Sequence, residues 1–497
     1  MPARALMVQG TSSHVGKSVL TAALCRIFAD EGYRVLPFKA QNMSNNADVT
    51  PDGGEISRAQ AEQARACRVA PSVDMNPILI KPMADTRAQL VVLGKPVGVL
   101  AAGDYPTVRP RLWDTVAAAL DRVRAAADLV IIEGAGSPAE INLRCCDLVN
   151  MAVAKAAEAP VLLVGDIDRG GVFAHLVGTL ELLAQEERAQ IRGFLINKFR
   201  GDLGLLEPGL IWLAARTGRP VVGVIPFLVG CDLPEEDSLP AVRVAGIPRR
   251  PPAAVRVEVV RLPHLANFTD FDALGREPDV QVTYVDAPDP GETADAVILP
   301  GSQSTIADLA SVKARGFPEY LARCLASGGE AVGICGGFQM LGRAIRDPEG
   351  VEATVPSAEG LGFLETVAVF HREKVTARVC AVHLASGLPV EGYEIHMGRI
   401  VSSPPDGAVV RITARNGVPV EETDGCAAAN GRVWGTHLHG LFDNAAFRAW
   451  WLNRLRARRG LPARRPPDGS GHDPYAALAA AVRPHLDWAA IRRMVFG

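Results

Sequence analysis

A glycine-rich turn near the start of the chain contains the residue types that bind phosphate. It follows an apolar run, opens an amphipathic stretch and reads Gly10-Thr11-Ser12-Ser13-His14-Val15-Gly16-Lys17-Ser18. In such a turn, glycines let backbone N–H groups surround a phosphate, a lysine neutralises the β and γ oxygens, and a serine hydroxyl is a Mg²⁺ ligand. The two glycines are one residue further apart than in the common P-loop. We predict a nucleotide site formed by Gly10, Thr11, Gly16, Lys17 and Ser18, the alternative being a capped turn without a ligand.

Polar residues also end three later apolar runs. Glu133 follows residues 129–132, Asp166 follows 161–164, and Asn197 and Lys198 follow 194–196. Because the carboxyl ends of parallel strands share one edge of a sheet, we expect these side chains near the phosphates. Glu133 is placed to hold Mg²⁺, with a loop-capping role as the alternative. Asn197 and Lys198 are candidates for contact with the nucleotide base, with a plain surface turn as the alternative.

A second site, with different chemistry, surrounds Cys335. The segment Gly333-Ile334-Cys335-Gly336-Gly337 follows an apolar run and is the thiol version of a nucleophile elbow. Such a turn places the thiol at a helix N-terminus, where the reactive thiolate is favoured. The N–H of Gly336 is then directed at a developing oxyanion. We predict that Cys335 is a nucleophile, the alternative being a small buried apolar residue.

A base for this thiol is expected on a later strand. His437 and His439 are two residues apart and share one face of a strand. The residue two positions after His439 is Leu441, so no acid stands next to this histidine in the sequence. Glu394 and His396 are candidates for orienting the base or contacting substrate, the alternative being the polar face of a strand.

The elements that position these residues form two α/β domains. Apolar runs alternate with amphipathic stretches, which predicts parallel sheets covered on both faces. The runs of the first domain are 5–8, 129–132, 161–164, 194–196 and 221–225, and those of the second are 257–260, 280–285, 296–299 and 331–334. A stretch rich in proline and arginine separates them. The predicted division is 1–245, a linker at 246–254, 255–460, and a loose segment plus a C-terminal helix at 461–497.

The composition is that of a folded globular protein. The chain has 497 residues, of which 48% are hydrophobic and 22% charged, with a net charge of −3. We therefore expect no nucleic-acid or membrane partner, and we interpret the arginines at 454, 456, 458 and 459 as a solvated helix face. Nine cysteines without metal-type spacing, and the lack of a signal peptide or a long apolar run, predict a cytoplasmic protein.

Several segments of the first domain resemble known families. The P-loop spacing and Glu133-Gly134-Ala135-Gly136 are similar to dethiobiotin synthetase, which phosphorylates a carboxylated intermediate. Residues 39–46, 54–60, 75–82, 166–174 and 197–202 narrow the resemblance to the cobyric acid synthase family. Ala47-Asp48 departs from that pattern, where a small hydroxyl residue is expected. The resemblance implies contacts with substrate by Gln41, Asn42, Asn45, Arg58, Lys81 and Asp166, with Arg87 as a further cation. For the cations the alternative is an ordinary surface charge.

The second domain resembles class I glutamine amidotransferases. The resemblance favours His439 as the base, and His437 stands where a tyrosine is more usual. The absent acid at Leu441 is similar to the cobyric acid synthase and cobyrinic acid diamide synthase branch, which implies a Cys-His dyad. Residues 299–305 resemble the loop that supplies the second oxyanion-hole amide, near Gly301 or Ser302. Residues 267–272 resemble another segment of the same family.

Together these resemblances imply a P-loop NTPase-like (dethiobiotin synthetase-like) domain followed by a class I glutamine amidotransferase-like domain. The implied reaction is amidation of the b, d, e and g carboxylates of adenosylcobyrinic acid a,c-diamide. It consumes ATP with Mg²⁺ and glutamine as co-substrate, and proceeds through acyl phosphates and released ammonia. The implied partners are these small molecules, and an oligomer is compatible with the sequence.

Two other functions compete with this one. A sister amidotransferase acting on another acid is disfavoured by residues 39–46 and 75–82. A P-loop switch or scaffold with an inactive amidase is disfavoured by the intact Cys335 and His439.

Overall fold

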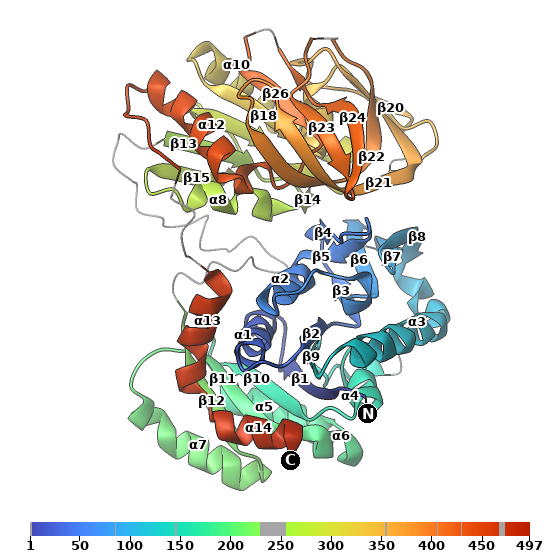
Figure 1. Ribbon diagram of the computed structural model, residues 1–497, viewed down its shortest axis with the longest axis vertical. Coiled ribbons are helices and arrows are strands. Elements are labelled where there is room, and N and C mark those ends of the chain that lie inside the picture. Colours follow the sequence, from blue (N-terminus) through green and yellow to red (C-terminus); the bar gives the residue numbers. More distant parts are fainter. Residues whose placement is uncertain are drawn as a thin grey trace.

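The computed structural model describes residues 2–84, 86–144, 147–228, 255–352, 355–404, 406–428, 430–466 and 473–497. Within these ranges the chain forms two α/β domains stacked along the long axis of the molecule (Figure 1). None of the helices in these ranges is long and apolar enough to cross a membrane. The predicted linker at 246–254 lies outside the described residues.

The first domain is built on a six-stranded sheet in the order β12-β11-β10-β1-β9-β2, and every pairing in it is parallel. Its strands are β1 (Arg4–Gly10), β2 (Val35–Phe38), β9 (Leu129–Glu133), β10 (Val161–Asp166), β11 (Ile191–Phe199) and β12 (Val221–Pro226). Helices cover both faces, and a buried apolar cluster lies on each. This explains why the central strands are apolar throughout, as the sequence predicts.

The helices of this domain are α1 (Lys17–Asp30), α2 (Arg58–Ala66), α3 (Tyr105–Ala126), α4 (Met151–Ala157), α5 (Val172–Leu182), α6 (Gln185–Gln190) and α7 (Leu203–Thr217). Shorter strands extend the domain toward its neighbour: β3 (Gln41–Met43), β4 (Ala47–Val49), β5 (Glu55–Ser57), β6 (Ile78–Ala84), β7 (Arg87–Val92) and β8 (Lys95–Ala101). They form a four-stranded sheet, β3-β6-β7-β8, and a β4–β5 pair. The segments predicted to line the substrate therefore sit on the side that faces the second domain (Figure 1).

The second domain contains a six-stranded sheet in the order β15-β13-β16-β18-β26-β25, parallel except for β25. Its strands are β13 (Val255–Val260), β15 (Val280–Val285), β16 (Ala296–Leu299), β18 (Glu330–Ile334), β25 (Cys426–Ala427) and β26 (Val433–Thr436). Its helices are α8 (Asp272–Gly275), α9 (Thr305–Ala314), α10 (Phe317–Ala326), α11 (Gly336–Leu341) and α12 (Ala445–Arg458). The alternation of strands and helices confirms the α/β class predicted for this half.

A further sheet of this domain does not follow from the strand–helix alternation. It contains β19 (Ala344–Arg346), β20 (Ser357–Glu359), β21 (Val367–His383), β22 (Pro389–Ser402), β23 (Val410–Arg415) and β24 (Val418–Asp424). The long strands β21 and β22 pair antiparallel and reach toward the first domain (Figure 1). The domain also contains a short antiparallel pair of strands, β14 (Leu265–Ala266) and β17 (Gly301–Ser302), and the 3-10 turns Phe268–Phe271 and Leu441–Asp443.

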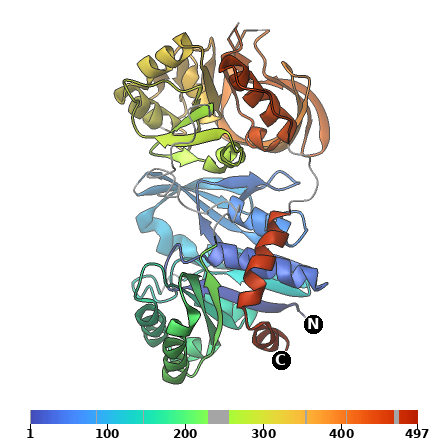
Figure 2. The ribbon, with the colours of Figure 1, turned by 90° about the vertical axis from the view of Figure 1, so that its left-hand side faces the viewer.

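The C-terminal segment returns to the first domain. It forms two helices, α13 (Pro474–Val482) and α14 (Trp488–Phe496), where one helix is predicted. Leu478, Val482 and Ile491 are buried in the apolar cluster that also covers α1, and Figure 2 shows α13 lying across that helix. The C-terminus is therefore part of the first domain's core.

An apolar cluster joins the two domains. Ala47, Val49, Leu79 and Val91 come from the first domain, and Tyr393 and Ile395 come from β22 of the second. All six are buried, so this contact removes apolar surface of both domains from water, the main source of cohesion between packed elements.

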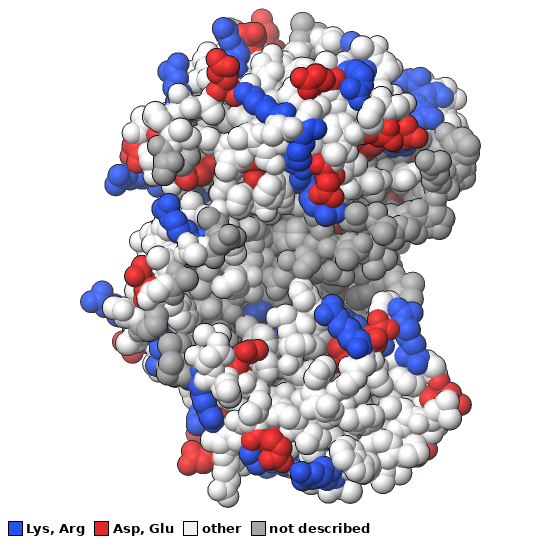
Figure 3. Space-filling model, turned by 180° about the vertical axis from the view of Figure 1, so that it is seen from behind, with Lys and Arg blue, Asp and Glu red and all other residues white. Residues whose placement is uncertain are grey.

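Charged residues of both signs are interspersed over the face shown in Figure 3, without a large region of one sign among the described residues there. The interpretation of the α12 arginines as a solvated face is wrong for Arg456. Arg456 of α12 is only 1% exposed and pairs with Asp279 at 2.8 Å, while Arg454 and Arg458 pair with buried Glu330 at 3.1 and 2.8 Å. Arg456 is therefore buried because α12 packs against the main sheet, whereas Arg458 and Arg459 are exposed, as the sequence predicts.

Candidate functional site

The predicted phosphate-binding turn lies between β1 and α1. Gly16 adopts a left-handed conformation (φ 97°), after which Lys17 begins the helix. The Lys17 Nζ lies over the turn, donating to the backbone oxygens of Ser12 (2.9 Å) and Gly136 (3.2 Å). The Thr11 hydroxyl is buried with no partner among the described residues. A helix N-terminus, a lysine and an unused donor converge here, as a phosphate site requires.

The carboxylate of Glu133 ends β9 beside this turn. The Ser18 hydroxyl donates to its Oε1 at 2.8 Å, so the two predicted Mg²⁺ ligands are adjacent. Lys39 pairs with the same oxygen at 2.9 Å, and Gln60 and Gln63 of α2 donate to Oε2. One serine and one carboxylate suit a Mg²⁺ ion that takes its remaining ligands from phosphate and water. The residues present therefore fit this ion.

Asn197 and Lys198 lie against the phosphate-binding turn. Asn197 donates to the backbone oxygen of Val15 at 2.8 Å, and a Cβ at Gly16 would lie 2.1 Å from its Nδ2. Lys198 donates to the backbone oxygen of His14 and pairs with Asp166 at 2.9 Å. These contacts brace the turn, and contact with a base stays a prediction.

Cys335 occupies a strained elbow between β18 and α11. Its backbone has φ 51° and ψ −109°, a conformation that a residue with a side chain rarely adopts and that concentrates at functional sites. Close packing requires a glycine at position 337, since a Cβ at Gly337 would lie 1.9 Å from the Leu299 carbonyl oxygen. The thiol is buried, 3.6 Å from the backbone oxygen of Ile395.

The imidazole of His439 is hydrogen-bonded to a carboxylate and interacts electrostatically with the Cys335 thiol. Its Nδ1 lies 2.6 Å from Oδ2 of Asp270, whose Oδ1 accepts from the Gly440 N–H at 3.1 Å. All three side chains are buried. Burial opposes the charge on His439, but the charges of Asp270 and Cys335 outweigh it and raise the pKa of His439 from 6.5 to about 10. Burial raises the pKa of Cys335, but the charge of His439 outweighs it and the net shift is downward. The arrangement favours a thiolate–imidazolium pair.

The sequence leaves open whether the site is a dyad or whether a carboxylate from elsewhere orients the imidazole, and the structure places Asp270 in that position. It lies in the segment 267–272, which follows β13 and for which the sequence predicts no catalytic residue. Neither Glu394 nor His396 takes this position: Glu394 pairs with Arg415 at 2.7 Å, and His396 Nδ1 donates to the backbone oxygen of Gly398 at 2.7 Å. The available signal is an acidic residue in the connection that follows β13, a strand whose carboxyl end shares a sheet edge with those of β18 and β26.

His437 belongs to a neighbouring buried cluster. Its Nδ1 lies 2.7 Å from Asp424, its Nε2 lies 3.2 Å from the Gln339 amide, and its ring stacks on His396 at 4.1 Å. This geometry supports the choice of His439 as the base, since both nitrogens of His437 have other partners.

The loop predicted to complete the oxyanion hole lies against the elbow. A Cβ at Gly301 would lie 3.1 Å from Cε1 of His439, and a Cβ at Gly336 would lie 3.0 Å from the Ser302 nitrogen. Only glycines allow these approaches without displacement. Gly301 and Gly336 are thus brought to the reacting groups, as expected of oxyanion-hole residues.

The residues predicted to contact substrate lie in different surroundings. Gln41 accepts from Tyr105 at 2.7 Å, and Asn42 is buried against Ser57 and Gln60. Asn45 Oδ1 is buried without a partner among the described residues. Lys81 sits in a buried triad with Glu55 and Lys374, with both N···O distances 2.7 Å. That triad joins the two domains, a role that the sequence does not indicate.

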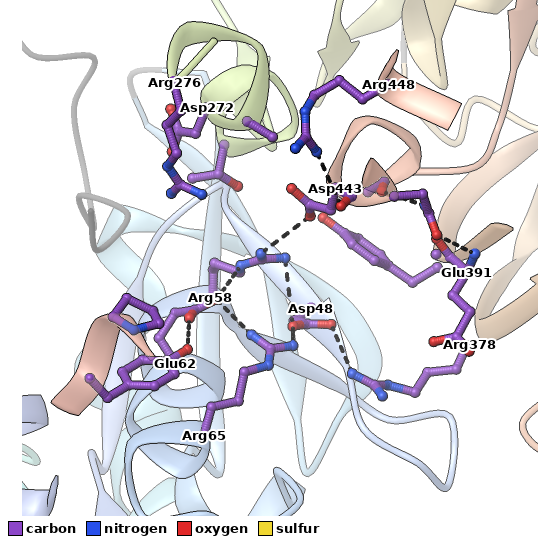
Figure 4. Close-up of a pocket in the computed structure, with 18 residues that line it drawn as sticks. Asp48, Arg58, Glu62, Arg65, Asp272, Arg276, Arg378, Glu391, Asp443 and Arg448 are labelled. Atoms are coloured by element: carbon purple, nitrogen blue, oxygen red, sulfur yellow. Dashed lines mark hydrogen bonds and ion pairs between the residues drawn. The ribbon is translucent and has the colours of Figure 1, made fainter. Parts of the chain in front are cut away.

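A cavity of about 580 Å³ opens where the domains meet, and its lining is rich in charge (Figure 4). Arg58 lies 2.8 Å from Glu62, 3.7 Å from Asp48 and 3.8 Å from Asp443 of the second domain. The guanidinium is therefore already surrounded by carboxylates. Burial raises the pKa of Asp443 to about 6, although the charge of Arg58 opposes this shift.

Comparison with known proteins identifies both domains. Residues 6–240 match the CobQ/CobB/MinD/ParA nucleotide binding domain, and residues 256–447 match the CobB/CobQ-like glutamine amidotransferase domain. The cobyric acid synthase of Sorangium cellulosum is 51% identical, covering 100% of this chain and 99% of that protein. That of Moorella thermoacetica is 51% identical, covering 93% and 91%, and that of Desulforamulus reducens is 47% identical, covering 99% and 98%.

These similarities confirm the predicted fold class and an enzyme that carries out amidation in cobalamin biosynthesis. The chain belongs to the cobyric acid synthase family.

Proposed function

We propose that this enzyme amidates the b, d, e and g carboxylates of adenosylcobyrinic acid a,c-diamide to give adenosylcobyric acid. Each amide consumes one ATP and one glutamine. The observation that carries the proposal is the Cys335–His439–Asp270 arrangement, assembled where the glutaminase domain meets the nucleotide-binding domain. The identity of the corrinoid substrate is taken from the family.

The glutaminase half-reaction begins at the thiolate–imidazolium pair. The Cys335 thiolate attacks the side-chain amide carbon of glutamine, and the N–H groups near Gly336 and Gly301 stabilise the oxyanion. His439 gives its proton to the departing nitrogen, which leaves as ammonia, and a thioester remains. His439 then takes a proton from water, which attacks the thioester and releases glutamate. Asp270 holds the imidazole in the required tautomer throughout.

The synthetase half-reaction takes place at the phosphate-binding turn. A substrate carboxylate oxygen attacks the γ-phosphorus of ATP, releasing ADP and forming an acyl phosphate. Ammonia attacks the acyl carbon, and inorganic phosphate leaves with the amide formed. Lys17 and the backbone N–H groups of the turn bind the phosphates. Ser18 and Glu133 would hold Mg²⁺, which supplies charge neutralisation at the phosphate oxygens.

The test is mass spectrometry of adenosylcobyrinic acid a,c-diamide incubated with enzyme, ATP, Mg²⁺ and glutamine. We expect four successive one-amide mass steps. Lys17→Ala should abolish them, whereas Cys335→Ser should lose only the use of glutamine and recover with ammonium salts. Cys380→Ser, at an exposed free cysteine, is the matched control and should retain full activity. Release of glutamate without any mass step would refute the corrinoid substrate.

A further inference from the structure

The turn that carries Asp270 is bonded directly to the first domain. The Asn46 side-chain oxygen accepts from the Phe268 N–H at 3.1 Å, and the Asn267 side-chain oxygen accepts from the Ala47 N–H at 2.9 Å. The Asn267 N–H also donates to the backbone oxygen of Asn45, at an N···O distance of 3.4 Å. Each asparagine side chain thus binds the backbone beside the other, and we call Asn46 and Asn267 the asparagine clasp.

The clasp is placed immediately before the catalytic carboxylate. Asn267 has a left-handed backbone (φ 50°), which asparagine tolerates better than most residues and which starts the 3-10 turn Phe268–Phe271. The Asp270 N–H donates to the Asn267 oxygen at 3.1 Å, so the clasped residue also caps the turn. Asn46, Asn267 and Asp270 are each 3% exposed, so the loss of any hydrogen bond that links them leaves a buried polar group without a partner, which is costly.

On the other side, Asn46 is fixed within the first domain. Its N–H donates to the Ser44 hydroxyl at 3.0 Å, and its backbone oxygen accepts from the Arg58 N–H at 3.0 Å, where α2 begins. The same helix supplies Gln60 and Gln63, which bind Glu133. The clasp therefore anchors the glutaminase turn to a rigid part of the synthetase domain.

We propose that Asn46 and Asn267 are positioning residues for glutamine hydrolysis. Through the clasp, the synthetase domain holds Asp270 at hydrogen-bonding distance from His439. This inference rests on the proposed glutaminase role of Cys335, His439 and Asp270, and deepens it. The competing view is that the turn is held by its own domain, where Phe271 is buried and the Tyr284 hydroxyl donates to the Phe268 oxygen at 3.0 Å.

The test uses the full-length enzyme with substitutions on both sides of the clasp. Asn267→Gly removes the side-chain acceptor but still allows the left-handed backbone conformation. Asn267→Asp keeps a side-chain acceptor and also tolerates the left-handed conformation. Asn46→Ala removes the acceptor on the other domain. Arg378→Ala is the matched control, because Arg378 donates to the Val49 oxygen at 2.9 Å across the same interface but does not contact the turn.

We expect Asn267→Gly and Asn46→Ala each to lower the kcat of glutaminase about 10²-fold, the loss typical of a misplaced catalytic group, with little change in KM. The double variant should lose no more glutaminase kcat than either single variant, because both substitutions disrupt the same clasp. The pH at which iodoacetamide alkylates Cys335 at half-maximal rate should rise, since a displaced Asp270 weakens the imidazolium that stabilises the thiolate. Asn267→Asp should restore activity toward wild type, and Arg378→Ala should retain it.

Amidation with ammonium salts serves as the measure of folding. If Asn267→Gly loses glutaminase but keeps ammonia-dependent amidation, the loss lies in the positioning of the triad. The proposal would be overturned if both clasp variants kept the wild-type kcat and alkylation profile. It would also be overturned if Arg378→Ala lost as much glutaminase kcat as the clasp variants. Failure of the wild-type enzyme itself to release ammonia from glutamine would instead refute the proposed function.

Discussion

Replacing Asp270 with asparagine keeps the shape of the side chain and removes its charge. The carboxylate accepts from the Gly440 N–H and lies 2.6 Å from His439 Nδ1. An asparagine can turn its oxygen to only one of these donors, so it favours the wrong tautomer or orientation of the imidazole. Asp270→Asn therefore tests the carboxylate with minimal change to packing.

The expected loss follows from the pKa of His439, which is raised from 6.5 to about 10. At about 1.4 kcal/mol per unit, Asp270 and the thiolate together favour the imidazolium by roughly 5 kcal/mol. If Asp270 supplies about half, its loss costs about 2–3 kcal/mol, or nearly 10²-fold in rate. The lost orientation adds to this, so we expect a decrease in kcat of about 10³–10⁴-fold, in the range of other triads that lose their acid.

The assay measures glutamate release and, separately, alkylation of Cys335 by iodoacetamide as a function of pH. Without Asp270 the pKa of His439 falls and the thiolate loses its cationic partner, so burial is no longer outweighed and the pKa of Cys335 rises. The alkylation midpoint should therefore shift to higher pH. Asp272→Asn, on the adjoining helix, is the matched control and should resemble wild type. A glutaminase kcat within tenfold of wild type in Asp270→Asn would refute the reasoning.

Three further outcomes are expected. His439→Asn should lower the glutaminase kcat at least about 10³-fold and His437→Asn only about tenfold, because His437 contacts Asp424 and not the catalytic pair. A larger loss in His437→Asn than in His439→Asn would show that the two roles are exchanged. Glu133→Gln should lower ammonia-dependent ADP release by about 10²-fold or more while leaving glutamine hydrolysis intact; unchanged ADP release would contradict a metal-binding role. Burial opposes the charge of Glu55, but Lys374 and Lys81 lower its pKa from 4.5 to about 2, so its stabilisation is present above pH 4.5 and lost as pH falls toward 2. Glu55→Gln should therefore lower the thermal unfolding temperature at pH 7 and flatten its decline in acid; an unchanged temperature would refute this.

The parts of the site that the sequence predicts well are local. The turn at residues 10–18 and the elbow at Cys335 each lie at a single strand–helix junction, so their geometry follows from adjacent residues. Asp270 and His439 are 169 positions apart and meet only because β13 and β26 end at the same sheet edge. The Glu55–Lys374 pair and the burial of Arg456 depend in the same way on contacts between distant segments, which charge patterns along the chain do not encode.

The acid that is absent two positions after His439 is replaced by Asp270, from a turn that contacts the other domain. Two positions after His439 stands Leu441, which is 1% exposed and packs in the apolar core with Phe271 and Phe442. A carboxylate there would be buried among apolar side chains without a partner, at a cost of several kcal/mol. The carboxylate comes instead from a turn at the domain interface, where polar groups of the synthetase domain bind its backbone. In the proposed role of the asparagine clasp, the orientation of the glutaminase base would depend on Asn46 of the nucleotide-binding domain, and loss of that contact would lower ammonia release.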